Sequence, residues 1–439
     1  SASTSLDNVA LASFFFNGQY DYANKYYLSA SVRTDGSSRF GSNNRWATFY
    51  SVGARYRLTG ESFMQLASNW LDELTLRVSY GTSGNQDVGG SWYASRGLYG
   101  FGYNYNSQPG SYRQQAGNPD LKWEQTAKFN VGVDLALWER RVNVEFDYYR
   151  HLTKDMVFDV PLSFTSGMSS IPTNVGELEN KGFEFSINAH AVSTQDWNWN
   201  IGYNISYNKN KITKMTFNDD PNYAGVIHGG IDGGTGYNAL IHRVGEAFNS
   251  FYVFEQIYGP DGKPIEGAYV DQNGDNQIND ADLICFKKAA PDVFMGLTSQ
   301  LSYKNWDFSF ALRGSFGNYV YNNVQSNREA YEGANMYDQT GFLKNRLTSA
   351  RSTDFKNAQY RSSYYVQNAS FVRMDNISLG YTFNKLFNDK QSARVYATVQ
   401  NPFVITKYKG LDPEISGEGI DNNIYPRPRV FMIGLNLNF

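Results

Sequence analysis

Residues 125–150 read QTAKFNVGVDLALWERRVNVEFDYYR, and their alternation decides the fold class. Within 129–137 every second residue is apolar, and the residues between them include an amide and a carboxylate. A tight polar link at 138–141 follows, and the same period of two resumes over 142–149. Because side chains alternate across a β-strand, this pattern predicts a hairpin with one apolar face and one polar face.

Similar alternating segments recur along the chain, at 28–32, 183–189, 199–207 and 431–437. Strands of roughly ten residues with one apolar and one polar face are typical of transmembrane β-barrels. The 33 Tyr and 30 Phe make up much of an aromatic share of 16%, as aromatic girdles at the two bilayer interfaces require. No stretch is apolar for the 18 or so residues of a membrane-spanning helix. The sequence therefore predicts an all-β, transmembrane antiparallel β-barrel, and the alternative is a large extracellular β-protein that uses Tyr and Phe as strand formers.

Short and long connections alternate from one end of the chain to the other. The turns at 23–25, 193–196 and 304–305 are short, whereas 209–291 and 318–368 are long. Outer-membrane barrels have short periplasmic turns and long extracellular loops. The pattern predicts about thirteen strands, an odd number for a barrel that normally closes with an even one. We therefore expect residues 1–439 to be the C-terminal portion of a larger barrel, with 209–291 as a long extracellular loop region.

The remaining connections are predicted to contain one helix. Apolar residues within 63–71 have the i, i+3, i+4, i+7, i+8 spacing of an amphipathic helix, which we expect to pack on the barrel rim. The segments 83–120 and 153–179 are polar and lack regular alternation, so they are predicted to be long irregular loops.

Few residues point to catalysis, and the sequence predicts that the protein is not an enzyme. The formal net charge of −3 provides no basic surface for nucleic acid. The single cysteine, Cys285, precludes an internal disulfide. The four histidines have no metal-ligand spacing, and no Gly-x-Ser-x-Gly elbow is present. The Gly-rich stretch 228–234 lacks the strand-to-helix context of a phosphate loop and is predicted to be flexible.

The sharpest local motif is DQNGDNQINDAD at 271–282. Oxygen donors at positions 1, 3, 5, 7 and 12, with an apolar residue at position 8, match a calcium loop. Position 6 is Asn276 rather than Gly, but Asn tolerates the left-handed conformation required there. The alternative is an Asx-rich turn without an ion. The predicted structural calcium ligands are Asp271, Asn273, Asp275, Gln277 and Asp282.

A family resemblance is carried by a series of motifs. They are RTDGSSRFG at 33–41, LRVSYGTSGNQ at 76–86, NPDLKWE at 118–124, NVGELENKG at 174–182, the acidic loop at 271–282, GLDPE at 410–414 and YPRPR at 425–429. With these motifs in this order, the chain resembles the SusC family, the TonB-dependent outer-membrane nutrient transporters of Bacteroidetes. The resemblance implies a plugged barrel of about 22 strands. The plug domain and the first strands would then lie outside this chain.

The resemblance also implies a function and partners. It implies active import of oligosaccharides or peptides across the outer membrane of a Gram-negative bacterium, with a SusD-type surface lipoprotein as a lid and energy supplied through TonB. Long loops would hold the ligand by stacking and hydrogen bonds, although aromatic loop residues also pack loops together. The candidate ligand-binding residues are Tyr103, Tyr105, Tyr112, Tyr223, Tyr237, Tyr331 and Tyr337.

Two other classes of protein stay open. A passive outer-membrane porin or a surface adhesin barrel would have no plug and an even number of strands within this chain. A secreted, soluble β-protein with calcium clips would tolerate a charge on the apolar strand face, which a lipid-facing strand does not.

Overall fold

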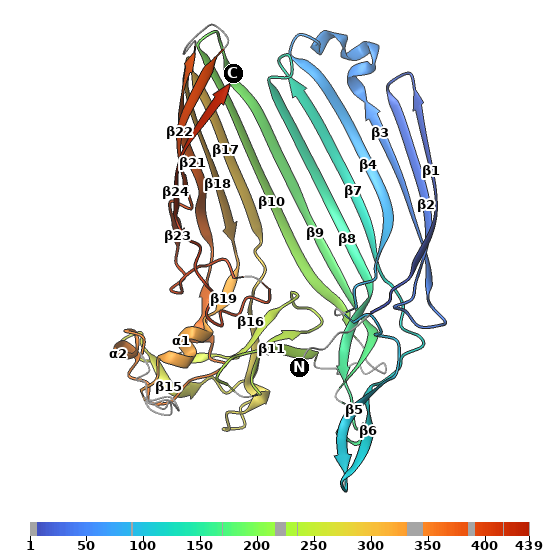
Figure 1. Cartoon of the computed structure of the whole chain (residues 1–439), viewed down its shortest axis with the longest axis vertical. Helices are drawn as coiled ribbons and strands as arrows, with labels where there is room; N and C mark the ends of the chain where they lie inside the picture. The colour runs from blue at the N-terminus through green and yellow to red at the C-terminus, as the bar shows by residue number, and fades with distance from the viewer. Residues whose placement is uncertain are drawn as a thin grey trace. The chain divides into compact units, whose positions relative to one another are not determined.

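The computed structural model describes residues 7–88, 91–168, 170–215, 225–234, 236–331, 346–384, 391–415 and 417–438. Most of these residues are in β-strands, so the predicted all-β fold class is confirmed (Figure 1). The chain forms two compact units. The first comprises Ser1–Arg140, Glu145–Phe183 and Lys209–Ala224, and the second comprises Arg141–Val144, Glu184–Asn208 and Gly225–Phe439.

The largest sheet among the described residues contains 14 strands. They are β1 (Leu11–Tyr22), β2 (Tyr26–Ser37), β3 (Trp46–Arg57), β4 (Leu71–Asn85), β7 (Glu124–Leu137), β8 (Val142–Pro161), β9 (Ser170–Ser193), β10 (Trp197–Met215), β17 (Val293–Tyr303), β18 (Trp306–Phe316), β21 (Phe371–Asn384), β22 (Ser392–Gln400), β23 (Val404–Thr406) and β24 (Val430–Asn438). Of these, only β23 lies off the path, paired to β21, so thirteen strands follow one another in chain order. The predicted number of strands is therefore confirmed.

In the first unit, the register gathers apolar side chains on one face of the strands. Phe16 of β1 lies opposite Val32 of β2, which lies opposite Tyr50 of β3, and all three are exposed. On the opposite face Asn17 lies opposite Ser31. An exposed apolar face backed by a polar one is the surface that a lipid-facing barrel strand requires.

The strands of the second unit repeat this arrangement. Leu379 of β21 lies opposite Ala397 of β22, which lies opposite Ile433 of β24. Leu379 and Ile433 are exposed, while the next positions along the strands pair Ser378 with Thr398. The predicted alternation is thus confirmed at the C-terminal end of the chain as well.

The long connections of the second unit fold into small sheets, and we call the described parts of 225–292 and 317–370 the loop region. Its four-stranded sheet has the order β11 (Val226–Gly230), β12 (Asn238–His242), β13 (Ser250–Phe254) and β16 (Leu283–Lys288). The other elements are β14 (Gln256–Tyr258), β15 (Pro264–Tyr269), β19 (Tyr319–Tyr321), β20 (Val366–Asn368), α1 (Asn323–Arg328), α2 (Ala350–Thr353), η4 (Asp280–Asp282) and η5 (Ser363–Tyr365). Leu240, Phe251, Val253 and Tyr321 form part of a fully buried core. None of these described strands joins the main sheet.

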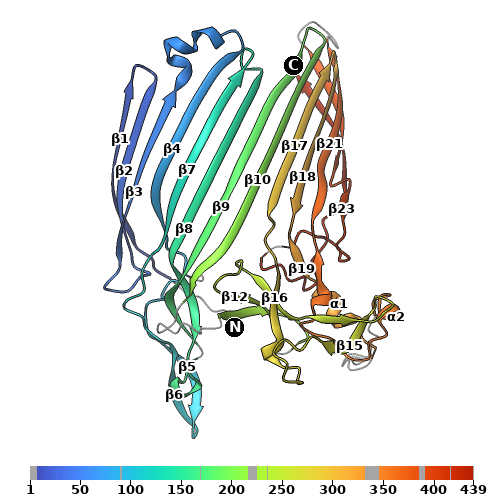
Figure 2. The ribbon, with the colours of Figure 1, turned by 180° about the vertical axis from the view of Figure 1, so that it is seen from behind.

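In the first unit, β5 (Leu98–Tyr105) and β6 (Gln108–Gln115) form a hairpin that extends past the ends of β4 and β7 (Figure 2). This hairpin lies inside the segment 83–120 that was predicted to be irregular. No helix in the described part of the chain has both the length and the apolar character of a membrane span.

The predicted amphipathic helix at 63–71 is wrong. The connection between β3 and β4 contains two 3-10 turns, η1 (Leu58–Gly60) and η2 (Ser62–Ala67). Leu71 belongs to β4 instead, where it lies opposite Leu137 of β7. Because Leu71 pairs in the sheet, it is not available as the last apolar residue of the predicted helix. The helix that would remain is short and has little stability of its own.

The predicted loop at 153–179 is also wrong over most of its length. β8 continues to Pro161 and β9 begins at Ser170, so only a short connection with the 3-10 turn η3 (Phe164–Ser166) separates them. Apolar residues are consecutive at 156–158 rather than alternating, and Phe158 and Val160 are buried, so the period of two that reveals a half-buried strand is missing there.

Candidate functional site

Arg77 of β4 has an ion-pair partner on each of the next two strands of the first unit. Its Nε and Nη2 donate to the two carboxylate oxygens of Asp134 at 2.8 and 2.7 Å, and Nη2 also donates to Asp147 Oδ2 at 3.0 Å. Gly132 is the register partner of Arg77, and a Cβ added there would lie 2.8 Å from Arg77 Nη2. Absence of a side chain at Gly132 therefore lets the guanidinium lie flat across the polar face.

The polar face of the first unit is hollowed near this ion-pair group. A cavity of about 550 Å³ is lined mostly by polar side chains of β1 to β4 and β7. Among them the Arg55 guanidinium lies 4.3 Å from the centre of the Tyr27 ring. The lining includes Gln19, Asp21, Tyr27, Ser29, Arg55, Arg77, Ser79 and Asn130. Hydroxyl, amide, guanidinium and aromatic groups together provide hydrogen bonds and stacking for a polar solute, and we find no arrangement of nucleophile and base among them.

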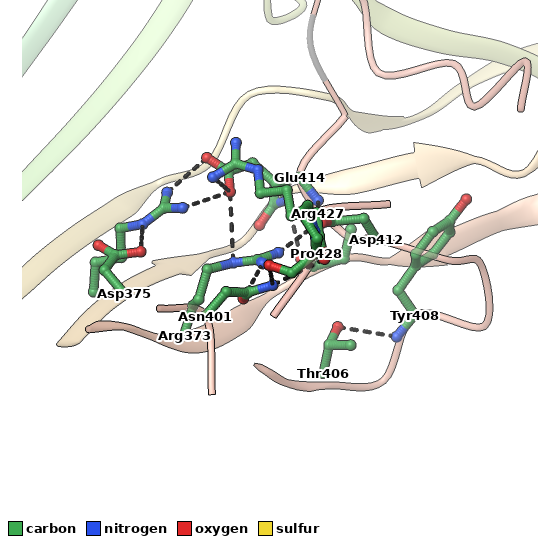
Figure 3. Close-up of polar contacts among 12 residues, drawn as sticks. Arg373, Asp375, Asn401, Thr406, Tyr408, Asp412, Glu414, Arg427 and Pro428 are labelled. Carbon is green, nitrogen blue, oxygen red and sulfur yellow. Dashed lines mark hydrogen bonds and ion pairs between the residues drawn. The ribbon is translucent and has the colours of Figure 1, made fainter. Parts of the chain in front are cut away.

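A cluster of three arginines and three carboxylates lies at β18 and β21 of the second unit (Figure 3). Arg313 Nη1 and Nη2 donate to the two oxygens of Glu414 at 2.6 and 2.8 Å, and its Nε donates to Asp375 Oδ1 at 2.7 Å. Arg373, which is only 1% exposed, donates from Nη2 to Asp412 Oδ1 at 2.5 Å. We call Arg313, Arg373, Asp375, Asp412, Glu414 and Arg427 the ionic cluster.

The ionic cluster fastens the connection between β22 and β24 to the strands. Arg427 Nη1 lies 3.1 Å from Glu414 Oε2, and Arg373 Nη1 donates to Asn401 Oδ1 at 2.8 Å. Asn401 Nδ2 in turn donates to the Arg427 carbonyl at 3.0 Å. Burial opposes ionisation of Glu414, but hydrogen bonds from Arg313 and the charges of the arginines outweigh it and lower the pKa of Glu414.

The sequence did not reveal this cluster. The motif at 410–414 was part of the family resemblance, but no role was predicted for its two carboxylates. The available indication was the position of Arg313 and Arg373 on strands, where a charged side chain needs a partner.

The structure describes part of the predicted tyrosine set in the first unit. Tyr103 and Tyr112 are exposed on the β5–β6 hairpin, with ring centres 4.8 Å apart in an edge-to-face arrangement. Tyr105 ends strand β5. Tyr223 and Tyr337 lie outside the described residues. Ligand binding by these side chains stays a prediction.

In the loop region, Tyr237 belongs to an aromatic group connected to the acidic loop. Tyr237 is exposed, the Arg361 guanidinium lies 4.7 Å from its ring centre, and the Tyr360 ring centre lies 5.9 Å away. Arg361 Nη2 also donates to Asp280 Oδ1 at 2.8 Å. Tyr331 is exposed too, and its backbone N–H donates to a loop carbonyl. Tyr237 is thus structurally linked to the 271–282 loop through one arginine.

The predicted calcium loop is closed by its own side chains. Asp271 accepts backbone N–H groups of Gly274 and Asn276, both at 2.7 Å, and Asp275 accepts the Asn273 side-chain amide at 3.0 Å. The buried carboxylate of Asp282 accepts the backbone N–H groups of Asn279 and Gln272, each at 2.9 Å. These hydrogen bonds, that from Asn279 above all, lower the pKa of Asp282.

The backbone of this loop has the conformation expected of a calcium loop, although this does not test whether an ion binds. Asn276 has φ of 62°, so the predicted left-handed conformation at position 6 is confirmed. Gln277 contributes its carbonyl to the Asn279 side-chain amide. No three His, Cys, Asp or Glu side chains converge as a metal site within the described ranges. Calcium binding therefore depends on amide oxygens in addition to carboxylates and stays a prediction.

Two of the four histidines meet in the loop region. The rings of His228 and His242 stack with centres 4.0 Å apart, and His228 Nδ1 lies 3.0 Å from Glu418 Oε1. Burial, together with the neighbouring His228, lowers the pKa of His242 to about 3. Because His228 pairs with Leu240 in the β11–β12 ladder, the predicted flexible loop is wrong for residues 228–230.

An antiparallel sheet with an exposed apolar face and a polar, charged opposite face is the arrangement typical of outer-membrane β-barrel proteins. Residues 1–402 match the family model described as TonB dependent receptor-like, beta-barrel. The chain therefore belongs to this family, and it is a protein of the outer membrane.

Individual relatives agree with this assignment. The chain is 40% identical over 440 residues to TonB-dependent receptor SusC of Bacteroides thetaiotaomicron. This alignment covers 98% of this chain and 44% of the relative. It is 32% identical to TonB-dependent receptor P3 of Formosa agariphila, in an alignment that covers 100% of this chain and 46% of that relative. The predicted resemblance to SusC is confirmed. These relatives are receptors of a transport family rather than enzymes.

A solved structure supports the fold. The structure of the RagAB peptide transporter matches with a TM-score of 0.82 and 30% identity, over 98% of this chain and 48% of that chain. The chain thus spans about half the length of the relatives it matches.

Proposed function

We propose that this chain is the C-terminal part of an outer-membrane active transporter that imports oligosaccharides or peptides. In this proposal a SusD-type surface lipoprotein forms a lid, and TonB supplies the energy. The observation that carries the proposal is the polar face of the first unit, with its charged and aromatic cavity, in a chain 40% identical to SusC. A ligand rich in hydroxyl or amide groups would find hydrogen-bond partners along such a face.

The test uses the full-length protein in its native host. We expect deletion of its gene to abolish uptake of fluorescent oligosaccharides or peptides, and an uncoupler of the proton gradient to abolish the same uptake in the parent strain. Uptake that persists after uncoupling would indicate a passive porin, and uptake unaffected by the deletion would indicate an adhesin. Purification from outer membranes without denaturant should recover a lipoprotein with the protein.

The exposed tyrosines provide a finer test of the same proposal. We expect Tyr237→Ala and Tyr103→Ala in the full-length protein to weaken binding of the imported ligand, measured by calorimetry. Tyr425, which is exposed but is not one of the predicted ligand residues, provides the matched control through Tyr425→Ala. Equal affinities for all three variants would remove these tyrosines from the binding site.

We also propose that the 271–282 loop binds Ca²⁺ as a structural ion. The left-handed Asn276 and the buried Asp282 support this, since a calcium loop needs a sharp turn at position 6 and a closing carboxylate at position 12. Calorimetric titration of the full-length protein with Ca²⁺ should show one saturable site that Asp271→Asn weakens and Asp261→Asn leaves intact. Absence of binding would identify the loop as an Asx-rich turn.

A further inference from the structure

The connection between β3 and β4, residues 58–70, exposes large apolar side chains. Leu66 is 93% exposed, Phe63 65% and Trp70 49%. Glu61 is the only charged residue in this stretch, whereas the short turns at 138–141 and 304–305 both contain basic residues. A turn in water has no reason to present such a surface, since apolar area is costly to leave hydrated.

The contacts of Glu61 show which face of the sheet this connection adjoins. Its carboxylate accepts the Tyr26 hydroxyl at 2.8 Å and the Tyr56 hydroxyl at 3.3 Å, and it pairs with Lys25 Nζ at 3.0 Å. Tyr26 and Tyr56 are register partners whose rings stack with centres 4.9 Å apart. They share a strand face with exposed Leu28, because side chains two residues apart point to the same side. Glu61 therefore ties the connection to the apolar, lipid-facing side.

Aromatic residues surround the connection. Four aromatic side chains at this end of the strands are exposed, namely Tyr22, Tyr26, Trp70 and Trp138. The backbone N–H of Trp138 donates to the Trp70 carbonyl at 2.9 Å, which joins two connections of the first unit. Tyr and Trp concentrate where a bilayer meets water, because their rings are amphipathic. The connection therefore adjoins the aromatic margin of the lipid-facing surface at both of its ends, through Glu61 and through Trp70.

We propose that residues 62–70 insert into the interfacial region of the phospholipid leaflet on the short-turn side of the barrel. Phe63, Leu66 and Trp70 would enter the headgroup and acyl boundary, as the apolar face of an interfacial segment does. Glu61 is the positioning residue: its partners Lys25, Tyr26 and Tyr56 hold the segment against the lipid-facing side. This contact would fix the depth of the barrel in the membrane, and it is independent of the ligand carried.

The experiment measures membrane depth at residue 66 in the full-length protein. A Cys285→Ser background carries Leu66→Cys labelled with an environment-sensitive fluorophore, reconstituted in phosphatidylcholine vesicles with and without doxyl-labelled lipid. The matched control is Glu139→Cys, on an exposed charged turn of the same unit. We expect doxyl lipid to quench the label severalfold more at 66 than at 139, and iodide to do the reverse. Equal iodide quenching at both positions, or protection at 66 from both quenchers because protein covers it, would overturn the proposal.

A second variant tests the role of Glu61. Glu61→Ala should reduce doxyl quenching at 66, because the segment loses its attachment, while a label at Val78→Cys on the strand face should keep its quenching. Heat-modifiable migration in gels checks that each variant folds. Unchanged quenching at 66 in a folded Glu61→Ala protein would overturn the positioning role.

Discussion

The strands of the first unit and the loop region of the second place their phenylalanines in opposite environments. Phe16 of β1 is 72% exposed, whereas Phe251 of β13 is fully buried. Phe16 lies opposite Val32 on a strand face that meets lipid, while Phe251 packs with Leu240 and Tyr321 in a core shielded from water. The comparison shows that apolar side chains serve two purposes in this chain. Those on the strand faces contact the bilayer, whereas those of the loop region pack against one another in a core.

The largest effect is expected from removing a core side chain. Phe251→Ala should destabilise the loop region by about 3–5 kcal/mol, since it removes buried surface and leaves a cavity. Phe16→Ala should have a much smaller effect in detergent, because that side chain contacts solvent rather than protein. Thermal unfolding of the full-length protein, followed by protease cleavage within the loop region, compares the two. Equal losses would mean that the strand face is packed against protein.

A second test separates buried from exposed charges. Asp412→Ala should cost about 3 kcal/mol, the lower end of the range for breaking a buried ion pair, because Arg373 keeps Asn401 as a partner. Asp261→Ala provides the control: its pair with Lys263 spans 3.9 Å and is exposed, so about 0–1 kcal/mol is expected. Unfolding in urea measures both, and a small loss for Asp412→Ala would show that the ionic cluster does not hold the connection.

A charge placed on each strand face sharpens the comparison directly. Val131→Lys near the middle of β7 should reduce the free energy of folding into phospholipid vesicles by about 2–4 kcal/mol. Asn130→Lys, one residue away on the polar face, should be tolerated, since that face lines the cavity. If both variants fold equally well in vesicles, the apolar face does not meet lipid.

The smallest effect concerns pH. Because the folded-state pKa of Glu414 is lowered, its ion pairs contribute stability above the unfolded-state value of 4.5 and lose it as the pH falls through the folded-state value. The loss should be about 1 kcal/mol or less, since the site is partly exposed. Comparing urea unfolding at pH 7 and pH 4 should show a smaller pH effect in Glu414→Gln than in the parent protein. Glu139→Gln on the exposed turn should match the parent, and an unchanged pH effect in Glu414→Gln would assign the dependence to other groups.

The sequence by itself determined the features that depend on neighbouring residues. Alternation in 125–150 predicted β7 and the start of β8, and the alternating connection lengths predicted thirteen strands. The left-handed conformation of Asn276 followed from one position in a loop motif. Each of these is local, because a period of two or a turn residue is visible within a few positions.

Only the tertiary structure decided which distant residues meet. Arg373 and Asp412 are 39 residues apart, and Arg313 and Glu414 are 101 apart, so their ion pairs depend on how the connection between β22 and β24 packs against β18 and β21 rather than on any local pattern. The same holds for the turn at 58–70, where helical spacing was misleading because pairing of Leu71 in β4 took precedence. Hydrophobic pattern tells which face of a strand is apolar, but only the packing of segments far apart in the sequence brings these specific charges within bonding distance.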